Sequence, residues 1–374
     1  KGRLHFADPG DVIYSKIDVR NGAIGIVPDD MKRVALSSEY PVYSVLPNVA
    51  LAEYIRLVFR TRYFRQAINS MISGASGRKR VQPKQIESLA IPLPPIHLQR
   101  AIVARWQQAR QAIAEAEERI KLLEAKIDAQ FFSDLGLKPP QAVKRPKAFA
   151  VPWKDSFQWS GRATYLLAQR HDLHKGKYPV VSGVDCLQEV KHGCGAPPSP
   201  KPTDLEILKI SAVTRGSFDP QQKKYAQDKK RFREDFDLKR GDVLMCRTNG
   251  TLEYVGMSAW VDKDMDNLIF PDKVIRVRSR DNILPEYLWK ILQLQPIRAQ
   301  IEAAARTAVG NYAIGTHDIW NLQIPLPPLD VQRDLMRRVA EGRAEIARER
   351  AAAQQRARDI EAEIEALILG TRAI

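Results

Sequence analysis

The side chains in this sequence that are suited to chemistry are mostly basic, and they gather in a few short stretches. Lys and Arg can bind phosphate groups, and Arg, Lys, Asn and Gln can reach the edges of bases in the major groove. The densest stretch is Gln221–Arg240, where eight Lys and Arg residues stand against four acids, with Tyr225 and Phe232 between them. The residues of this stretch expected to contact nucleic acid are Lys223, Lys224, Lys229, Lys230 and Arg231.

Further candidates lie at the ends of expected strands and in two loops of small residues. Arg247, Thr248 and Asn249 follow an expected strand, and Lys16 stands at the corresponding position earlier in the chain. The remaining candidates are Arg78, Lys79, Arg80, Arg215, Asn311 and Tyr312. For each residue taken alone, a solvated charged surface is the alternative interpretation, and the choice between base and phosphate contacts stays open.

The sequence offers little for catalysis or for binding a metal. The three cysteines form no Cys-x-x-Cys motif, and His192 beside Cys194 has no further ligand nearby in sequence. A Gly-x-x-x-x-Gly-Lys-Ser/Thr motif, an Asn/Asp-Pro-Pro-Tyr/Phe box and a Gly-rich cofactor loop are absent. Asp204 with Glu206–Lys209 resembles part of a nuclease site, but the acids are too close together, and Pro271-Asp272-Lys273 is isolated. We therefore expect a chain with no catalytic residue, metal ligand or cofactor of its own.

The net charge points to a polyanionic partner. Of the 374 residues, 59 are Lys or Arg and 44 are Asp or Glu, which gives a charge of +15 and a pI near 9.7. This balance favours nucleic acid as the partner. The apolar runs are too short for a membrane span, no signal peptide opens the chain, and the cysteine usage fits a reducing compartment. We expect a cytoplasmic protein.

The elements that must position the basic residues occur twice. The pentapeptide Ile-Pro-Leu-Pro-Pro at residues 91–95, followed by Gln99-Arg100, recurs 233 residues later at 324–328, followed by Gln332-Arg333. The tripeptide Gly-Asp-Val at residues 10–12 recurs 231 residues later. Ordered self-similarity indicates a duplicated module, here a globular unit, a proline-rich corner and a long helix. Each Gln-Arg pair falls in the first turn of that helix, where it either caps the helix or docks a partner.

Each module is expected to combine short strands with an amphipathic helix. Residues 11–17 and 242–247 are predicted to be buried strands that follow Gly-Asp turns. Residues 52–72 and 285–305 are predicted to be matching amphipathic helices, the second broken at Pro296. Polar loops are expected next, at residues 73–80 and 306–312. The modules are therefore mixed α and β without an alternating βαβ order.

Two longer helices carry heptad repeats. The apolar positions of the first are Ile102, Trp106, Ala109, Ile113, Ala116, Ile120, Leu123, Ile127 and Phe131. Those of the second are Val339, Ile346, Ala353, Ile360 and Leu367, and Gly342 and Arg350 weaken the alternate row. A lone heptad helix is marginal in water, so each needs a partner, most simply the other. About 35 residues make a rod of about 50 Å. Homodimerisation or a plain helical bundle is the alternative.

This ordered set, present twice, resembles the specificity subunit of type I restriction–modification enzymes, and residues 208–216 are similar to the early part of a recognition domain of that family. The resemblance implies an α+β fold, with tandem mixed α/β target-recognition domains separated by two long helices that form an antiparallel coiled coil. It implies that each domain reads half of a split target in double-stranded DNA and that the chain is not itself catalytic. The implied partners are two methyltransferase (modification) subunits, which use S-adenosylmethionine, and motor–nuclease (restriction) subunits, which use ATP and Mg.

The resulting domain organisation has five parts: a first recognition domain at 1–95, a spacer helix at 96–135, a Pro-rich linker at 136–152, a second recognition domain at 153–328 and a second spacer helix at 329–370. Nine residues precede the first Gly-Asp-Val and about 90 precede the second within its module, so we expect the first domain to be truncated at its N-terminus. Two rival interpretations are the DNA-recognition half of a larger fused methyltransferase or restriction enzyme, and a non-specific basic coiled-coil scaffold.

Overall fold

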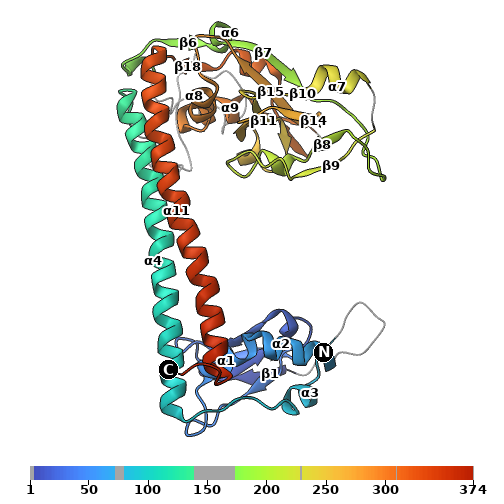
Figure 1. Cartoon of the computed structure of the whole chain (residues 1–374), viewed down its shortest axis with the longest axis vertical. Helices are drawn as coiled ribbons and strands as arrows, with labels where there is room; N and C mark the ends of the chain where they lie inside the picture. Colours follow the sequence, from blue (N-terminus) through green and yellow to red (C-terminus); the bar gives the residue numbers. More distant parts are fainter. Residues whose placement is uncertain (1–3, 72–79, 139–172, 228–229, 309, 374) are drawn as a thin grey trace. The chain divides into compact units, whose positions relative to one another are not determined.

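The computed structural model describes residues 4–71, 80–138, 173–227, 230–308 and 310–373. The chain forms two compact units (Figure 1): unit 1 comprises Lys1–Leu122 and Glu345–Ile374, and unit 2 comprises Leu123–Ala344. Each unit therefore combines a globular module with part of both long helices. Most of the linker predicted at 136–152 lies outside the described residues, and the predicted domain boundaries stay predictions.

The main sheet of unit 2 is built around a buried strand. β11 (Val243–Cys246) lies between β13 (Ser258–Trp260) and β15 (Val274–Ser279), and β7 (Leu187–His192) extends the sheet beyond β15. All of these pairs are antiparallel. The four residues of β11 are completely buried, which explains why the strand is an uninterrupted apolar run. It corresponds to the strand predicted at 242–247.

The other sheets of unit 2 are smaller. One has the order β10 (Asp237–Leu238), β14 (Met265–Ile269), β8 (Glu206–Leu208) and β9 (Lys223–Tyr225), in which only β14 and β8 are parallel. β12 (Thr248–Asn249), β17 (Asn311–Ala313) and β16 (Arg306–Ala308) form a second, and β18 (Gln323–Pro325) pairs with β6 (Val180–Ser182). Short helices among these strands are α6 (Gly183–Cys186), α7 (Lys230–Phe236) and α10 (Thr316–Trp320).

Unit 1 repeats part of this arrangement. β2 (Val12–Tyr14) lies between β3 (Ile24–Ile26) and β5 (Val42–Tyr43), in the order that β13, β11 and β15 have in unit 2. β1 (Leu4–Ala7) pairs with β4 (Val34–Ser37) as β10 pairs with β14. One pair agrees across the 231-residue offset, since Ala7 lies opposite Val34 and Leu238 lies opposite Met265, and the register of β10 then shifts at Asp237. The duplication seen in the sequence is therefore a duplication of topology.

The two Gly-Asp turns have the same geometry. Gly10 and Gly241 have φ values of +87° and +94°, which glycine adopts without strain. In each turn the Asp carboxylate accepts the backbone N–H three residues before it, Asp11 from Asp8 at 2.8 Å and Asp242 from Lys239 at 2.9 Å. The motif is thus a local device that starts the strand carrying the predicted site residues.

The amphipathic helices are both interrupted. Residues 285–305 form α8 (Pro285–Leu292) and α9 (Gln295–Ala304), with Pro296 in the first turn of α9, so the predicted break is confirmed. Residues 52–72 also form two helices, α1 (Ala52–Arg60) and α2 (Arg62–Met71), so the prediction of one continuous helix was wrong. Thr61 causes the break, because its Oγ1 donates to the Val58 carbonyl at 2.7 Å and accepts the Phe64 N–H at 3.2 Å.

Two long helices follow the modules, α4 (Ile96–Asp134) after the first and α11 (Leu329–Ile368) after the second. A short helix, α3 (Pro83–Glu87), precedes the first proline box. Most of the predicted heptad positions are buried: Ile102, Ala109, Ile113, Ala116, Ile120, Phe131, Val339, Ile346, Ala353, Ile360 and Leu367. Trp106, Leu123 and Ile127 are half-buried. The heptad pattern therefore identified the contact face of both helices.

The two helices pair antiparallel within each unit. In unit 1 Arg105 of α4 pairs with Glu363 of α11 at 3.0 Å, and Arg119, further along α4, pairs with the earlier Glu349 of α11 at 3.7 Å. In unit 2 Arg338 of α11 contacts Asp134 of α4 at 3.0 Å. The expected α+β fold with an antiparallel coiled coil is confirmed. Gly342, which interrupts the alternate apolar row of the heptad, lies against Ile127, where an added Cβ would come within 2.7 Å of the Ile127 side chain.

The glutamine of each Gln-Arg pair joins the globular module to the start of its long helix. Gln99 and Gln332 are completely buried. The Gln332 amide donates to the Asn282 and Pro327 carbonyls at 3.0 and 2.8 Å and accepts the Leu284 N–H at 2.8 Å. Gln99 makes the same three bonds, with Val49, Pro94 and Leu51. These contacts support the structural interpretation for the glutamines, whereas Arg100 and Arg333 are exposed.

Candidate nucleic-acid interface

Arg247, one of the predicted site residues, follows the buried strand β11 directly. Its N–H donates to the Lys273 carbonyl at 2.8 Å, and its carbonyl accepts the Ile314 N–H at 3.1 Å. The guanidinium Nη1 donates to the Asp272 carbonyl at 3.2 Å, and the buried Nε has no hydrogen-bond partner among the described residues. The backbone of Arg247 is thus fixed on both sides, while its guanidinium keeps an unsatisfied donor.

Thr248 and Asn249 form β12, which pairs with β17 so that Asn249 lies opposite Tyr312. β17 also pairs with β16, so most of the polar loop predicted at residues 306–312 belongs to two antiparallel strands, 306–308 and 311–313, instead. Gly310 accounts for the tight turn with its φ of +78°. The hairpin brings Asn311 and Tyr312 beside Arg247, Thr248 and Asn249, from which about 60 residues separate them in sequence.

Two further basic side chains at this place, Lys273 and Arg306, were not among the predicted site residues. Lys273 is exposed and adjoins Arg247 through the backbone bond. Arg306 lies on β16 with its side chain 77% exposed, 3.9 Å from the Asp318 carboxylate. Burial and the positive charge of Arg247 lower the pKa of His192, so the ring is neutral near pH 7. In the sequence Lys273 stands in the tripeptide Pro271-Asp272-Lys273, which has no other candidate residue nearby. It lies beside Arg247 only because β11 pairs with β15, and the sequence does not reveal that pairing.

Unit 1 has the same arrangement around Lys16. The Lys16 N–H donates to the Glu39 carbonyl at 3.0 Å, and its carbonyl accepts the Val81 N–H at 2.8 Å. These bonds are equivalent to those of Arg247, which shows that Lys16 and Arg247 occupy the same position in the repeat. Arg80 joins the site through an ion pair with the Glu39 carboxylate at 3.1 Å. The structure therefore brings Lys16 and Arg80 together, with Glu39 in the place that Lys273 has in unit 2.

The other described candidates lie on different elements. Lys223 and Lys224 belong to β9, at the edge of the sheet β10-β14-β8-β9 of unit 2. Lys223 forms an ion pair with Glu206 on the adjacent strand at 2.6 Å, whereas Lys224 is exposed. Arg215 is exposed in a turn that contains Gly216, whose φ is +81°. No hydrogen bond or ion pair described for these residues links them to the site around Arg247.

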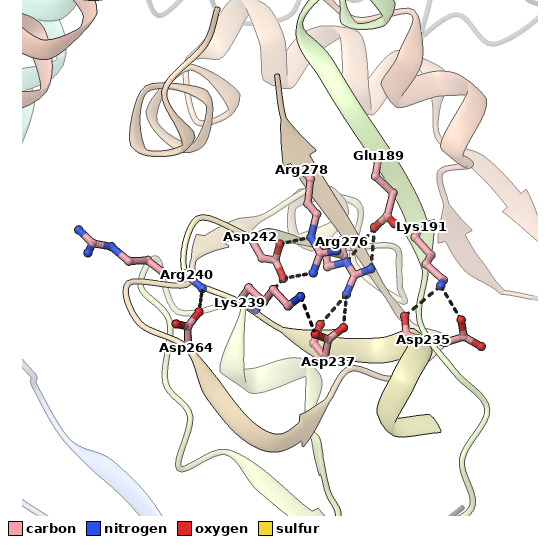
Figure 2. Close-up of polar contacts among 10 residues, drawn as sticks. All are labelled: Glu189, Lys191, Asp235, Asp237, Lys239, Arg240, Asp242, Asp264, Arg276 and Arg278. Carbon is pink, nitrogen blue, oxygen red and sulfur yellow. Dashed lines mark hydrogen bonds and ion pairs between the residues drawn. The ribbon is translucent and has the colours of Figure 1, made fainter. Parts of the chain in front are cut away.

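Figure 2 shows that part of the basic stretch Gln221–Arg240 is matched by acids. Lys239 lies 3.4 Å from the Asp237 carboxylate. The backbone N–H of Arg240 donates to Asp264 at 2.8 Å, while the Arg240 guanidinium points away from that carboxylate. Arg233 contacts the side-chain oxygen of Asn267. Of these contacts only that of Lys239 with Asp237 joins opposite charges, because the Arg240 bond is made by the backbone and Asn267 is neutral.

A buried charged network lies beneath this stretch (Figure 2). The Arg276 side chain is 2% exposed and donates to Glu189 at 2.7 Å and to the Asp237 carbonyl at 2.5 Å. Arg278 donates to both carboxylate oxygens of Asp242, at 2.6 and 3.2 Å. Burial acts to lower the pKa of Arg278, but the hydrogen bond and charge of Asp242 outweigh it and raise the pKa. Because these charges are paired and enclosed, the network has a structural role.

Some predicted residues cannot be placed. Arg78, Lys79 and Lys229 lie outside the described residues, and for Lys230 and Arg231 only the backbone, in α7, is described. All the site assignments stay predictions.

In the described part of the chain, no three His, Cys, Asp or Glu side chains gather as metal ligands would. None of the helices described is both long enough and apolar enough to cross a membrane.

The fold and the repeated basic site define a class: a protein of two tandem α+β modules with two long antiparallel helices. Residues 5–125 match the family described as type I restriction modification DNA specificity domain. The chain is 26% identical to the EcoKI specificity subunit of Escherichia coli strain K12 over 285 residues, 75% of this chain and 56% of that relative. It is 23% identical to the EcoEI specificity subunit of Escherichia coli over 89% of this chain and 67% of that relative.

A solved structure shows the same fold over nearly the whole chain. It comes from work on complex assembly and conformational transition of the type I restriction–modification system. The match has a TM-score of 0.64 and 16% identity, and covers 98% of this chain and 84% of the other. The resemblance inferred from the sequence is confirmed: this chain is related to the specificity subunits of type I restriction enzymes. It spans little more than half the length of the EcoKI relative.

Proposed function

We propose that this chain is a DNA-specificity subunit in which each unit reads one part of a bipartite target. The observation that carries the proposal is the repeated basic site. Lys16 and Arg247 occupy the same position in the two units and are held by equivalent backbone hydrogen bonds. A two-part target needs two such sites, and a chain with a net charge of +15 is attracted to DNA as a whole.

The chemistry of the site in unit 2 suits recognition of DNA. Arg247 is half-buried and its backbone is fixed on both sides, and an Arg fork matches the two acceptors of guanine. Asn249 and Asn311 can both donate and accept, as adenine recognition requires. Lys273 and Arg306 carry exposed positive charge beside them, which suits phosphates. In this proposal the polar β-hairpin reads bases and the surrounding basic residues hold the DNA backbone.

Catalysis belongs to partner subunits in this proposal. Two methyltransferase subunits with S-adenosylmethionine modify the target adenine, and motor–nuclease subunits with ATP and Mg cleave DNA. The support is the relation to proteins named as specificity subunits. The long helices serve as the spacer between the half-targets, since an α-helix of 39 residues measures about 58 Å, longer than one turn of B-DNA at about 34 Å.

Selection from a randomised duplex library tests the proposal, with the chain alone and with its methyltransferase subunit. We expect two short enriched blocks separated by an unread gap of fixed length. A single block would mean that one unit reads alone and would refute the bipartite reading. Binding without enrichment, which weakens steeply as salt rises, would favour the non-specific scaffold.

Substitutions then separate the roles within unit 2. Arg247→Ala is expected to cost about 1–3 kcal/mol and to relax specificity at one base pair. Lys273→Ala is expected to weaken all sequences alike and to reduce the salt slope by about one ion. Lys239→Ala is the matched control, because that charge is already paired with Asp237. Equal behaviour of the three variants would refute the assignment of the site.

A further inference from the structure

A cavity of about 560 Å³ lies within unit 1, where α1 and α2 meet α4 and the last turns of α11. The charged side chains in its described wall are Arg60, Arg62, Arg65, Glu361 and Glu365. The first of these arginines ends α1, the other two lie on α2, and both glutamates lie on α11. A cavity of this volume is in the range of small-molecule sites, roughly 300–1,000 Å³.

The arginines at this cavity repel one another more than nearby acids compensate. Burial, and then the positive charges of Arg56 and Arg110, lower the pKa of Arg60, and the charge of Glu361 opposes them only in part. Within the described part of the chain, no hydrogen bond or ion pair is made by the side chains of Arg56, Arg60, Arg62 and Arg65. Because like charges held together disfavour one another, a bound anion would stabilise this site.

The repeat in unit 2 shows what the same helices look like without these charges. α1 and α2 match α8 and α9 at an offset of 233 residues. The match extends to side chains, since Tyr54 donates to the Pro92 carbonyl at 3.0 Å as Tyr287 donates to the Pro325 carbonyl at 2.8 Å. At this offset the counterparts of Arg56, Arg60 and Arg62 are uncharged: Trp289, Gln293 and Gln295.

The two arginines that the repeat keeps have partners in unit 2. Arg298, the counterpart of Arg65, forms an ion pair with Glu302 at 3.3 Å. Arg343, the counterpart of the arginine on α4, lies over the Trp289 ring, 4.6 Å from its centroid. The module therefore folds without a group of uncompensated arginines, and the presence of such a group in unit 1 indicates a ligand rather than a requirement of the fold.

We propose that this cavity of unit 1 binds a phosphate group through Arg60, Arg62 and Arg65. Guanidinium groups match phosphate oxygens with paired N–H donors, and a phosphate monoester brings a charge of about −1.5 to −2 at pH 7, more than one carboxylate supplies. The phosphate belongs either to a small phosphorylated molecule or to the DNA backbone. Lys16 does not line the cavity, so the site is distinct from the proposed reading site of unit 1.

The test is a titration of the full chain with inorganic phosphate, followed by hydrogen exchange of the backbone amides, beside sodium chloride at the same ionic strength. We expect saturable protection of residues 57–65 and 361–371, and none at residues 290–298, the corresponding part of unit 2. Arg60→Gln, which copies the residue of unit 2, should weaken phosphate binding at least tenfold. Arg60→Lys keeps the charge and should lose less.

A second readout separates binding from a structural role. Without phosphate and at low salt, Arg60→Gln should slow exchange in α1, because it removes repulsion. Faster exchange would mean that the arginine holds the fold, and would overturn the proposal. Arg356→Gln is the matched control, an exposed arginine of α11 in unit 1 outside the cavity wall. Equal protection by chloride, or an equal loss in Arg356→Gln, would show general screening only and would also overturn it.

Binding to a DNA duplex identifies the source of the phosphate. If the DNA backbone supplies it, Arg60→Gln should reduce the salt slope of duplex binding by about one ion. If the slope is unchanged while inorganic phosphate no longer binds, the source is a small phosphorylated molecule. Both results support the site, and neither depends on the enrichment of sequence blocks in the library selection, so the proposed function and this inference can fail separately.

Discussion

Replacing Gln332 by glutamate should uncouple the second module from its long helix with almost no change in side-chain shape. The Oε1 acceptor for the Leu284 N–H is kept, but the amide that donates to the Asn282 and Pro327 carbonyls becomes a carboxylate oxygen. Gln332 is completely buried, so water cannot replace the lost donors. A buried polar group left unsatisfied costs about 1–3 kcal/mol, so two carbonyls together cost about 2–6 kcal/mol.

The effect should depend on pH in a defined direction. Burial beside two carbonyls raises the pKa of the introduced carboxyl in the folded state above its value in the unfolded state. The folded state then binds the proton more tightly, so the variant is most stable below the unfolded pKa of about 4.3 and loses stability as the pH rises through the folded pKa. Protonation restores one O–H donor, so part of the loss is recovered in acid.

The assay is urea unfolding at pH 7 and pH 4.5, with hydrogen exchange at Leu284 to locate the effect in unit 2. Gln99→Glu is the matched variant and should produce the same loss in unit 1, at Leu51. Arg333→Gln, at the exposed neighbour, should change neither. A loss below about 1 kcal/mol at pH 7, or a Leu284 amide as protected as in the parent, would refute the structural role of the glutamine.

Three further predictions concern the same framework. Asp128→Asn removes the counter-ion of the Lys290 ammonium, which is 8% exposed and lies 2.5 Å from the Asp128 carboxylate. Since Asp128 is half-exposed, we expect the free energy of unfolding, measured by heat or urea, to fall by about 1–3 kcal/mol. Adding Lys290→Met should largely reverse this loss, because no buried charge is then left unpaired. Gly342→Leu forces a side chain against Ile127 and should lower the free energy of unfolding by about 1–3 kcal/mol. Gly370→Leu is the control, because a Cβ there meets nothing within 4 Å and only its φ of +69° introduces strain. Burial raises the pKa of Cys186 and of Cys246 to about 11 from an ordinary 9.0. Alkylation of these thiols at pH 8 should therefore be far slower in the folded protein than after unfolding. Both thiols should stabilise the folded state below about pH 9 and lose that contribution as the pH rises through 11. Rapid native alkylation, measured by mass spectrometry, would contradict the burial of the thiols.

The sequence predicted elements whose signals are local or periodic. Most heptad positions of α4 and α11 are buried, because a seven-residue repeat places one face of a helix against its partner regardless of what else the chain does. The Gly-Asp turns and the strands after them were also predictable, since glycine at positive φ and an uninterrupted apolar run act within a few residues. Thr61 shows the limit, because its capping bonds were available to sequence reasoning and were overlooked.

The candidate site depended more on tertiary structure. The sequence located Arg247 and its counterpart Lys16 through the repeat, but Lys273 and Arg306 join Arg247 only through strand pairing. Similarly, the excess charge of the stretch Gln221–Arg240 is reduced by Glu206, which lies outside the stretch and pairs with Lys223 across two neighbouring strands.

By itself, the sequence determined the duplication, the faces of the long helices and the relation to specificity subunits, because these are written in periods and spacings along the chain. Only the tertiary structure decided that both glutamines are buried links and that β16 pairs with β17 beside Arg247. The physical reason is that hydrogen bonds and burial between distant segments depend on strand register, and single-sequence patterns do not encode which strand pairs with which.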